Sequence, residues 1–577
     1  MTMARREDRL LFLPLGGVGE IGMNCCLYGS GGKWLMVDLG MAFADERLPG
    51  IDLVVPDLTY IEERRDDLTA LVLTHGHEDH LGAVPYLWER LRCPIYATAF
   101  TATLLRSKLR EAGLLDRVPL IEFRAGETLD LGPFRVRALT VTHSIPEAHS
   151  LLIETGQGRV LHTGDWKLDP DPLVGPETDA AGLAAAGDAG ILALVCDSTN
   201  VLRPGTSGSE AAVRAGLRTL LAARRGRIVL TTFASNVARI DTILALAAEI
   251  DRHVVLVGRS LWRVVEAAKA CGYLADRQPV LSERDYGYLP RDKVLLLCTG
   301  CQGEPKGAMA RIAAGQHPHV ALSTGDLAVF SSKIIPGNER TLYRLHDRLA
   351  RSGIEVVSEK DHFVHVSGHP SRDELARYYA WARPEIAVPV HGEPRHLIEH
   401  ARLARSLGVP QVASAENGAL WQLAPGPARQ IDTVPSGRLA VETSRVLLPI
   451  EGGVLQERRR LMHHGSASVA LVLTADGSLA LPPTVGLHGI AETAGPLEAK
   501  AAAAIAAALT KLSRNARSSD DAVEEAVRQA LRRTLKPISE RRPLVRVHLL
   551  RLAADPGPSP EPVTADILPQ DATAPDR

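Results

Sequence analysis

Three histidines and one aspartate stand within six residues of this chain, in the stretch HGHEDH that begins at His75. Imidazole and carboxylate groups at such density can bind metal ions or act in acid–base chemistry. His75 and His77 are two residues apart on an extended segment, so both side chains can reach one ion. Asp79 and His80 follow at an expected helix start and can reach a second ion. A solvated polar loop is the alternative, but an apolar strand precedes the motif.

Further ligand-type residues close other apolar stretches. His143 follows VRALTVT, Asp165 follows GRVLHTG and His391 follows EIAVPV. Sheet enzymes commonly keep functional side chains on the loops at strand ends. A single histidine at such a place is more often structural, but several strand ends with the same chemistry indicate one metal centre. We interpret His162, near Asp165, as structural.

A glycine-rich stretch near the start imitates a cofactor site. GVGEIG, Gly17 to Gly22, has the spacing of a dinucleotide-binding turn, and Asp38 lies about 20 residues further on. That turn needs a helix directly after the glycines, because the helix N-terminus binds the pyrophosphate. The residues that follow, MNCCLYGSGGKWLMVDLG, are typical of a β-hairpin. We therefore predict no nucleotide cofactor.

The secondary-structure pattern of the elements that must position these residues changes along the chain. Residues 1–208 alternate short β-rich segments with turns. Over 209–360, helical periodicity in SEAAVRAGLRTLLAAR and NVARIDTILALAAEI alternates with strands such as RIVLTTFAS, which predicts an inserted α/β domain with a parallel sheet. Over 361–432 the pattern of short β-rich segments and turns returns, so the first domain is expected to be completed after the insertion.

The remaining residues are expected to form three parts. Residues 433–455 are a predicted linker. Residues 456–553 are a predicted small α/β domain, with a strand at SVALVLT, an Ala-rich helix over about 496–514, a helix at DDAVEEAVRQALRRTLK and a strand at PLVRVHLLRL. Residues 554–577 are rich in Pro and Asp, and we expect a disordered tail.

Composition narrows the class of protein. A chain of 577 residues is too long for one hydrophobic core, so several domains are expected. The net charge of −2 provides no global attraction for nucleic acid. No apolar run reaches the roughly 18 residues of a membrane span, so we predict no membrane segment. The seven scattered cysteines favour a reducing cytoplasm. Cys298 and Cys301 form a C-x-x-C without a second pair, which argues against a zinc knuckle.

Several motifs together carry a family resemblance. THGHEDH, VTHS, HTGDWK and the later histidine resemble the metallo-β-lactamase superfamily. The inserted domain, DSTN, TTFASN, HVSGH and PVHGE resemble its β-CASP branch, in particular bacterial ribonuclease J, over about residues 8–553. The resemblance implies an α/β fold: a metallo-β-lactamase αββα sandwich from 1–208 and 361–432, an inserted β-CASP domain over 209–360 and a small C-terminal α/β domain.

The resemblance also implies a ligand set for two zinc ions, with manganese or magnesium as alternative supports for activity. Three histidines would hold one ion, an aspartate and two histidines the other, and one aspartate would bridge them: His75, His77 and His143; Asp79, His80 and His391; and Asp165. Asp38 would steady the metal loops from behind. With a bridging hydroxide such a site carries about +1, which favours a phosphodiester. The ligands alone also allow a β-lactam or thioester hydrolase.

The inserted domain favours RNA over a small molecule, because it can roof the site and form a channel. In the family, TTFASN and HVSGH bind RNA phosphates and form a pocket for a 5′-monophosphate. This implies seven substrate-binding residues: Ser235, Asn236, His365, Val366, Ser367, Gly368 and His369. Without the family pattern, ordinary polar turns would be an equal interpretation. The loop with Gln302, Glu304 and Arg311 is a candidate channel wall.

Two residues are candidates for proton transfer. Asp197 of DSTN is expected near the attacking water, and His369 near the leaving oxygen. His365 could replace His369 in this role, and the sequence does not separate them.

We therefore predict a cytoplasmic two-zinc ribonuclease for RNA maturation and decay, including rRNA and mRNA. It would degrade single-stranded RNA 5′→3′ from a 5′-monophosphate and also cut internally. Expected partners are a second or further copies, as a homodimer or homotetramer, and proteins of an RNA-decay complex. The alternatives are another β-CASP endonuclease or a non-catalytic RNA-binding scaffold.

Overall fold

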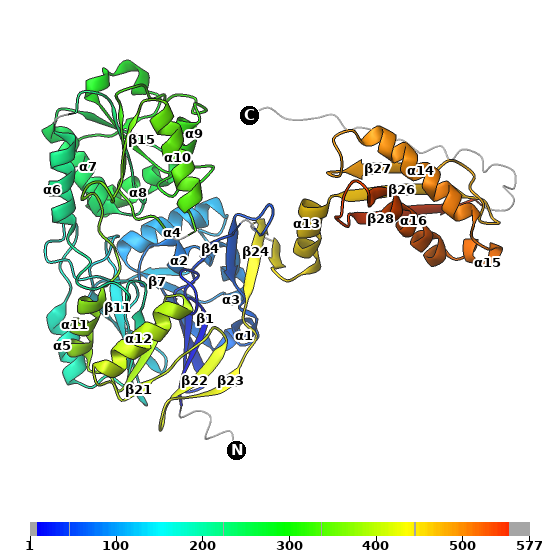
Figure 1. Ribbon diagram of the computed structural model, residues 1–577. Coiled ribbons are helices and arrows are strands. Elements are labelled where there is room, and N and C mark those ends of the chain that lie inside the picture. Colours follow the sequence, from blue (N-terminus) through cyan, green and yellow to red (C-terminus); the bar gives the residue numbers. More distant parts are fainter. Residues whose placement is uncertain (1–8, 46, 223, 336, 444–445, 553–577) are drawn as a thin grey trace, which may run out of the picture. The chain divides into compact units, whose positions relative to one another are not determined.

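The computed structural model describes residues 9–552 apart from 46, 223, 336, 444 and 445, so the tail predicted to be disordered lies outside the described residues. The chain divides into two compact units (Figure 1). The larger unit is Met1–Ala44 with Ile51–Leu448, and the smaller is Asp45–Gly50 with Pro449–Arg577. No helix of the described part is long and apolar enough to cross a membrane.

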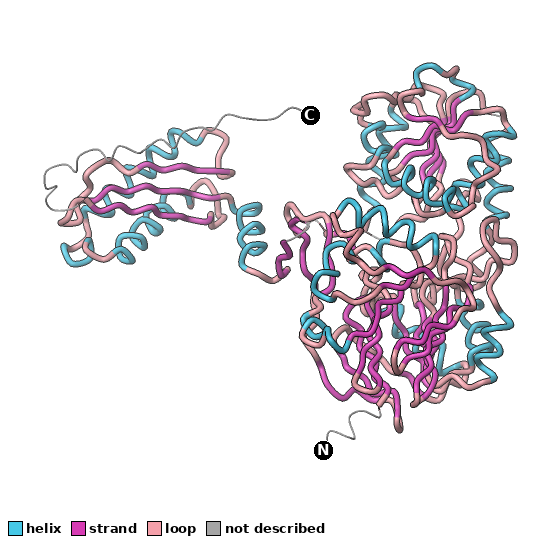
Figure 2. The backbone as a smooth tube through the Cα atoms, turned by 180° about the vertical axis from the view of Figure 1, so that it is seen from behind, coloured by secondary structure: helices cyan, strands magenta, loops and turns pink. Residues whose placement is uncertain are grey.

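Two facing β-sheets form the centre of the larger unit (Figure 2). The first has the strand order β23 (Arg429–Thr433), β22 (Ala419–Ala424), β1 (Leu10–Gly16), β2 (Cys25–Ser30), β3 (Lys33–Val37), β6 (Leu68–Val72), β7 (Ile95–Ala97), β8 (Leu120–Glu122). The second has the order β21 (Gln411–Val412), β20 (Ile386–Val390), β13 (Ala193–Asp197), β12 (Gly158–His162), β11 (His149–Thr155), β10 (Phe134–Thr140), β9 (Thr128–Leu131). Phe12, Val72, Ile153 and Val195 belong to the apolar core that the two sheets share.

Helices cover the outer face of each sheet. The first sheet is covered by α1 (Thr59–Glu62), α3 (Val84–Leu91) and α4 (Ala99–Glu111), which bury Met36 and Leu71 from its strands. The second is covered by α5 (Ala180–Asp188), α11 (Arg372–Ala382) and α12 (Pro394–Ser406), which bury Leu161 and Leu194. Successive strand residues face opposite sides, so Leu71 and Val72 enter different cores. These four layers confirm the predicted αββα sandwich.

Between β13 and β20 the chain leaves the sandwich and forms a separate lobe, green in Figure 1. The two strands themselves pair in parallel, with Ala193 beside Ile386 and Asp197 beside Val390. The sandwich is therefore completed by residues that follow the insertion, as predicted. The first crossover into the lobe runs through Ser207 and the second returns through His369.

The lobe is built on a parallel six-stranded sheet, which confirms the predicted βαβ pattern. Its order is β16 (Leu281–Ser282), β15 (His253–Val257), β17 (Val294–Cys298), β14 (Ile228–Thr231), β18 (Leu327–Phe330), β19 (Glu355–Val357). Its helices are α6 (Glu210–Leu221), α7 (Val237–Glu249), α8 (Arg259–Ala270), α9 (Ala308–Ala313) and α10 (Glu339–Arg351). One core lies beneath α6, α7 and α8, and another beneath α9 and α10.

The predicted linker, 433–455, differs from its expected form. A four-stranded sheet has the order β25 (Val446–Pro449), β24 (Arg438–Thr443), β5 (Leu53–Pro56), β4 (Ala42–Phe43). β24 pairs antiparallel with β5, and Leu439 and Ala440 are buried. Burial of these side chains makes half of the expected linker an integral part of the larger unit. The predicted domain boundaries stay predictions.

The smaller unit places two long helices against a three-stranded sheet. Its elements are α13 (Gly453–His464), β26 (Ser466–Leu473), β27 (Thr484–His488), α14 (Ala494–Thr510), α15 (Arg514–Arg517), α16 (Asp520–Leu535) and β28 (Leu544–Arg551). β26 is the central strand, antiparallel to β27 and parallel to β28. The structure confirms both predicted helices and both predicted strands, although α14 ends four residues earlier than expected. α13 and β27 are additional elements that the sequence analysis does not predict.

Candidate metal centre

Ligand-type side chains gather where strands of both sheets end. His75 and His77 follow β6, His143 follows β10, Asp165 follows β12 and His391 follows β20. Asp79 and His80 lie on the short helix α2 (Glu78–Leu81) directly after β6. The seven predicted ligands form two groups that share Asp165, and within each group the candidate ligand atoms lie within 4.8 Å of one another.

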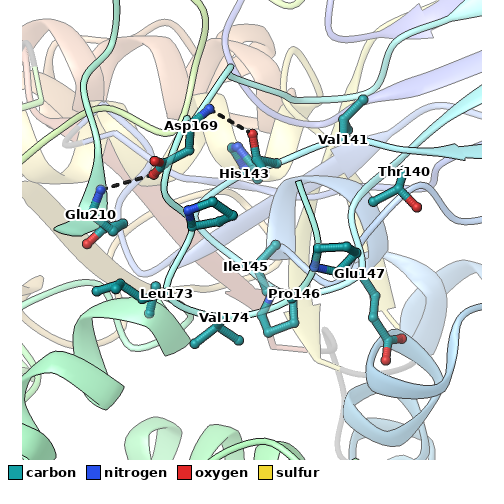
Figure 3. Close-up of a pocket in the computed structure, with 15 residues that line it drawn as sticks. Thr140, Val141, His143, Ile145, Pro146, Glu147, Asp169, Leu173, Val174 and Glu210 are labelled. Carbon is teal, nitrogen blue, oxygen red and sulfur yellow. Dashed lines mark hydrogen bonds between the residues drawn. The ribbon is translucent and has the colours of Figure 1, made fainter. Parts of the chain in front are cut away.

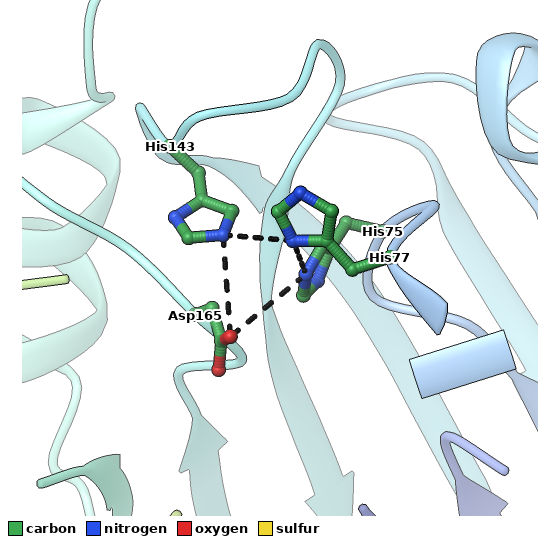
Figure 4. A group of neighbouring side chains, drawn as sticks. All are labelled: His75, His77, His143 and Asp165. Atoms are coloured by element: carbon green, nitrogen blue, oxygen red, sulfur yellow. Dashed lines mark hydrogen bonds and ion pairs between the residues drawn. The ribbon is translucent and has the colours of Figure 1, made fainter. Parts of the chain in front are cut away.

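The first group is His75, His77, His143 and Asp165 (Figure 4). The Nδ1 atom of His77 lies 3.0 Å from His75 Nε2 and 3.1 Å from His143 Nε2. Asp165 Oδ2 lies 3.9 Å from His75 Nε2 and 4.0 Å from His143 Nε2. Ligand atoms around a tetrahedral zinc ion lie about 3.3 Å apart, so this spacing fits such an ion.

The protonation state of these imidazoles suits a cation. Burial lowers the pKa of His77 to about 4, and burial together with neighbouring histidines lowers the pKa of His75 and His143. His143 Nδ1 donates a hydrogen bond to Gly368 O at 2.5 Å, so its Nε2 lone pair faces the group. Neutral rings that direct lone pairs at one point repel each other unless a cation lies between them.

The second group is Asp79, His80, Asp165 and His391. His80 Nε2 lies 3.2 Å from Asp165 Oδ2 and 3.5 Å from Asp79 Oδ2. His391 Nε2 lies 3.2 Å from Asp79 Oδ2. Asp165 thus faces both groups, as the sequence analysis expects of a bridging carboxylate. The backbone N–H of His391 donates to Gly17 O at 2.7 Å, so the glycine-rich turn, which leads into the β2–β3 hairpin as predicted, positions a ligand.

Asp38 holds the second group from behind. It is 1% exposed and accepts hydrogen bonds from His80 Nδ1 at 2.7 Å, Thr74 N at 2.8 Å and Thr74 Oγ1 at 2.8 Å. These bonds fix the ring of His80 with its Nε2 atom toward the ligands. The expected support of the metal loops by Asp38 would act through these bonds.

A third cluster joins Asp197 and His369 to Asp165 and His391. The carboxylate of Asp197 is already occupied: Oδ1 accepts from Thr199 N and Thr199 Oγ1, and Oδ2 accepts from His369 Nδ1 at 2.8 Å. Thr199 Oγ1 also accepts from His391 Nδ1 at 2.9 Å. Through these contacts Asp197 orients His369 and, by way of Thr199, His391. The expected role of Asp197 near the attacking water stays a prediction.

His369 and His365, which the sequence does not separate, lie in different surroundings. The ring of His369 lies 5.2 Å from that of His143 and stacks on that of His391 at 5.4 Å. Burial alone lowers the pKa of His369, but the carboxylates of Asp197 and Asp165 outweigh it and raise the pKa. His369 is therefore the one of the two whose ring lies beside candidate metal ligands.

His365 faces a cluster of cations instead. Burial lowers its pKa, and so do the positive charges of four side chains around it: Arg239, Lys333, Lys167 and Arg203. Its Nδ1 atom is buried with no hydrogen-bond partner in the described part of the chain. Two of these cations, Lys167 and Arg239, form buried ion pairs with Asp169 and Glu210. An anion with acceptor oxygens, such as a phosphate, could satisfy the buried Nδ1 atom.

The other predicted substrate-binding residues differ in how free their side chains are. Asn236 is 3% exposed; it caps α7 by accepting from Arg239 N and donates to Glu210 Oε1. Val366 is buried in the core of the lobe. Ser367 Oγ accepts from Asn200 Nδ2 at 2.7 Å, whereas Ser235 is half-buried. A role of Asn236 and Val366 in substrate binding would therefore use their backbone groups.

The predicted channel-wall residues contribute unevenly. Gln302 is buried, donates to Lys333 O at 2.8 Å and accepts from Ile335 N at 2.9 Å, so it shapes the loop that carries Lys333. Glu304 and Arg311 are exposed.

Several residues at the site carry no metal-type signal in the sequence. Asn24 lies within 3.0 Å of His80 Nε2 and donates to Asp79 O. Thr142, next to His143, pairs with Lys167 and so joins the His143 and Asp165 loops. Lys167 in turn forms a buried ion pair with Asp169 at 2.8 Å. The sequence could have indicated Thr142 and Lys167 only through their closeness to the predicted ligands His143 and Asp165.

A small hollow lies between the His143 loop and helices α6 and α7 (Figure 3). Asp169 crosses it: its backbone N donates to Thr142 Oγ1, and its carboxylate accepts from Glu210 N at 3.0 Å. Glu210 forms a buried ion pair with Arg239 of α7. A continuous polar chain thus connects the metal loops to the lobe.

Family models match successive parts of the chain. "Metallo-beta-lactamase superfamily" matches residues 18–210 and "Ribonuclease J, beta-CASP domain" matches 225–349. "Zn-dependent metallo-hydrolase RNA specificity domain" matches 353–414, and "Ribonuclease J C-terminal domain" matches 453–552.

Proteins named ribonuclease J resemble this chain over most of its length. The one from Sinorhizobium meliloti is 42% identical over 554 residues, 95% of this chain and 98% of that protein. The one from Mycolicibacterium smegmatis is 39% identical over 489 residues, 84% of this chain and 87% of that protein. A crystal structure of an Enterococcus faecalis protein of unknown function aligns with a TM-score of 0.50 at 17% identity, covering 72% of this chain and 99% of that one. That likeness shows the fold alone.

Proposed function

The chain belongs to the ribonuclease J family of metal-dependent ribonucleases, and we propose that it shortens single-stranded RNA from a 5′-monophosphate end and also cleaves internally. The observation that best supports this proposal is the convergence of seven histidines and aspartates in two groups that share Asp165, with His369 of the segment HVSGH beside them. HVSGH lies within the match to the RNA specificity domain.

We propose that two zinc ions occupy the two groups, with Asp165 shared between them, and that manganese or magnesium can support activity. One ion would be held by His75, His77 and His143, and the other by Asp79, His80 and His391. When bound, the ions supply an activated water at neutral pH and neutralise charge on the phosphate. Asp38 and Gly368 O fix the rings of His80 and His143, and such outer contacts commonly decide metal affinity.

In this proposal His369 protonates the leaving 3′-oxygen. Its Nδ1–H is donated to Asp197, so Nε2 is the atom from which a proton can be transferred. Asp197 keeps the ring in place and raises its pKa, which favours the protonated form that a general acid needs. Thr199 links the same carboxylate to His391, so the proton donor and a metal ligand share one support.

The 5′-monophosphate would bind at the cation cluster around His365. Burial lowers the pKa of Lys333, and so do the positive charges of Arg203 and Arg395. Lys333 is half-buried and the two arginines are exposed, and a dianionic phosphate would offset their like charges. A terminal monophosphate presents more charge and more free oxygens than an internal phosphodiester, so this pocket favours an RNA end.

The cellular setting follows from the substrate. We propose action in the cytoplasm on RNA maturation and decay, which the seven unpaired cysteines suit. We also propose a homodimer or homotetramer, because the smaller unit matches the family's C-terminal domain and exposes Leu481 and Leu550. Proteins of an RNA-decay complex are the further partners in this proposal.

The first experiment compares two RNAs that differ at one end. A 5′-labelled monophosphate RNA and its triphosphate twin are incubated with the intact protein and with His77→Ala, in zinc or manganese. We expect mononucleotide release from the monophosphate RNA, slow attack on the triphosphate RNA and no cleavage by His77→Ala. Equal internal fragments from both RNAs would leave an endonuclease without end selection and contradict the pocket assignment.

Two further variants separate the roles of the histidines. His369→Gln should lower kcat by about 10²–10⁴ with little change in KM, the size expected on loss of a general acid. His365→Gln should instead raise KM for the monophosphate RNA by roughly tenfold and leave the triphosphate RNA unaffected, because one charged hydrogen bond to phosphate is lost. His253→Gln, at an exposed position in the lobe, is the control for both.

A further inference from the structure

A dense group of cations lies at one end of the smaller unit. The segment RRTLKPISERR, residues 532–542, carries five Lys and Arg and a single Glu. It comprises the last turn of α16 and the loop toward β28. Its five cationic side chains are all exposed, and we call them the basic patch: Arg532, Arg533, Lys536, Arg541 and Arg542.

The loop of the basic patch is held against the end of α13. Arg541 Nη1 donates to His463 O at 2.8 Å, and Arg541 N donates to Ser539 Oγ at 3.2 Å. Ile538 N and Ser539 N both donate to Leu535 O. These contacts give the cations a defined backbone. They also place Arg460, exposed one turn before His463, at the same end of the unit.

No ion pair within the described residues joins any side chain of the basic patch to a carboxylate. Elsewhere in the same unit, arginines are paired: Arg528 with Glu524, and Arg546 with Glu457 at 2.7 Å. Residues 453–552 together carry fifteen Lys and Arg against nine Asp and Glu, a charge of +6, whereas the whole chain carries −2. The excess positive charge of this unit is thus concentrated at exposed positions without carboxylate partners.

Two general explanations for cations fall short here. Cations at a helix C-terminus stabilise the helix dipole, which accounts for Arg532 and Arg533 in the last turn of α16. Arg541 and Arg542 follow the helix and gain nothing from it. Solubility is served by mixed charges, and segments dominated by one sign are typical of electrostatic binding sites.

We propose that the basic patch binds the phosphate backbone of the RNA substrate as a second contact, independent of the metal centre. Exposed Arg and Lys that meet successive phosphates release counterions, which gives affinity without base specificity. A ribonuclease that handles long chains then holds its substrate at two places. The proposal goes beyond the reaction at the metal centre and predicts that affinity increases with RNA length.

The test measures binding by the full chain, with His77→Ala present in every protein so that the RNA stays intact. The triple variant Arg532→Gln, Lys536→Gln, Arg542→Gln removes three exposed charges. Its matched control, Lys500→Gln, Lys511→Gln, Arg514→Gln, removes three exposed charges from another part of the same unit. Dissociation constants are measured for 5′-monophosphate RNAs of about 6 and about 40 nucleotides over a range of salt, lengths chosen to occupy one site or to extend beyond it. Light scattering reports the oligomeric state.

We expect the triple variant to bind the long RNA roughly tenfold more weakly at low salt and to bind the short RNA unchanged. The slope of log K against log salt for the long RNA should fall by about 2, since each phosphate contact on a single strand contributes about 0.7. The matched control should behave like the parent. Equal binding by both variants would overturn the proposal, and so would a change in assembly without a change in RNA binding, which would make the basic patch a contact between copies. Cleavage of RNA by the protein without His77→Ala tests the proposed function separately.

Discussion

His143 and Gly368 are 225 residues apart in sequence, yet the ring Nδ1 of His143 donates a hydrogen bond to the carbonyl oxygen of Gly368 at 2.5 Å. Gly368 belongs to the segment through which the chain returns from the inserted lobe. One metal-ligand candidate is therefore oriented by the second crossover, whose next residue, His369, is the candidate proton donor.

Gly368→Ala should disturb the first metal group. A methyl group at this position would lie 2.9 Å from both His143 Cε1 and Ser144 Oγ, so the ring of His143 would have to move. We expect metal content to fall from two ions toward one and kcat to fall by about 10² or more, because outer contacts strongly affect metal sites. Metal analysis after dialysis and single-turnover cleavage measure this. Gly156→Ala, where a methyl group would meet nothing within 4 Å, is the control and should retain both ions.

Asp38→Asn should weaken the second metal group. Asn keeps the backbone conformation of this position, with a φ of 62°, but it cannot accept from both His80 and Thr74 as the carboxylate does. We expect the affinity for zinc to fall about 10- to 100-fold. Competition with a chelating dye provides the dissociation constants, and exposed Asp276→Asn is the control. An unchanged affinity would remove Asp38 from the support of the site.

Glu374→Gln should destabilise the larger unit. The buried carboxylate accepts four hydrogen bonds, from Leu168 N, Ser207 N, Ser207 Oγ and Ser371 N. It thereby joins the Asp165 loop to both crossovers. An amide would direct N–H groups at backbone donors, so we expect a loss of about 3 kcal/mol in the free energy of unfolding. Urea unfolding measures the loss, and Glu416→Gln on the surface should show none.

His400→Gln should change how stability depends on pH. Burial lowers the pKa of His400 to about 4, while Ser198 Oγ and Tyr379 OH contact its two ring nitrogens. The unfolded chain, with a histidine pKa near 6.5, binds more protons between about pH 4 and 6.5, so stability is lost as the pH falls through that range. The variant should show about 3 kcal/mol less of this loss in unfolding measured from pH 7 to pH 4. Exposed His253→Gln should keep the parent slope; if His400→Gln keeps it too, the histidine is already protonated in the folded chain.

Much of the fold can be predicted because its pattern is local. An apolar strand that ends in a polar ligand type, as at His143 and His391, indicates both the element and its function. β27 and β24 are harder to predict, since Thr484–His488 contains a glycine and Leu439 and Ala440 bury only two side chains against distant β5. α13 lacks an apolar stripe, as only Leu455 is buried in it.

Some features of the site can likewise be predicted from local sequence, and others cannot. The ligand set is visible because each ligand has a distinctive type, and the family resemblance supplies its grouping. The sequence does not separate His365 from His369, because alternate residues on an extended segment point the same way. Only the tertiary neighbours, Asp197 for one and the cations for the other, distinguish them. Asn236 shows a related ambiguity, because a side chain that caps a helix has the same residue type as one that binds phosphate.

The place of the insertion also sets a condition on synthesis. β20 enters its sheet beside β13, and His391 follows it, so the second metal group lacks one of its histidines until the whole lobe has been translated. His369 and the oxygen of Gly368 are delivered just before it. A nascent chain that has emerged only as far as the lobe therefore holds six of the seven candidate ligands but neither His391 nor His369, and the messenger and ribosomal RNA that surround it during translation are exposed to an enzyme that is not yet assembled.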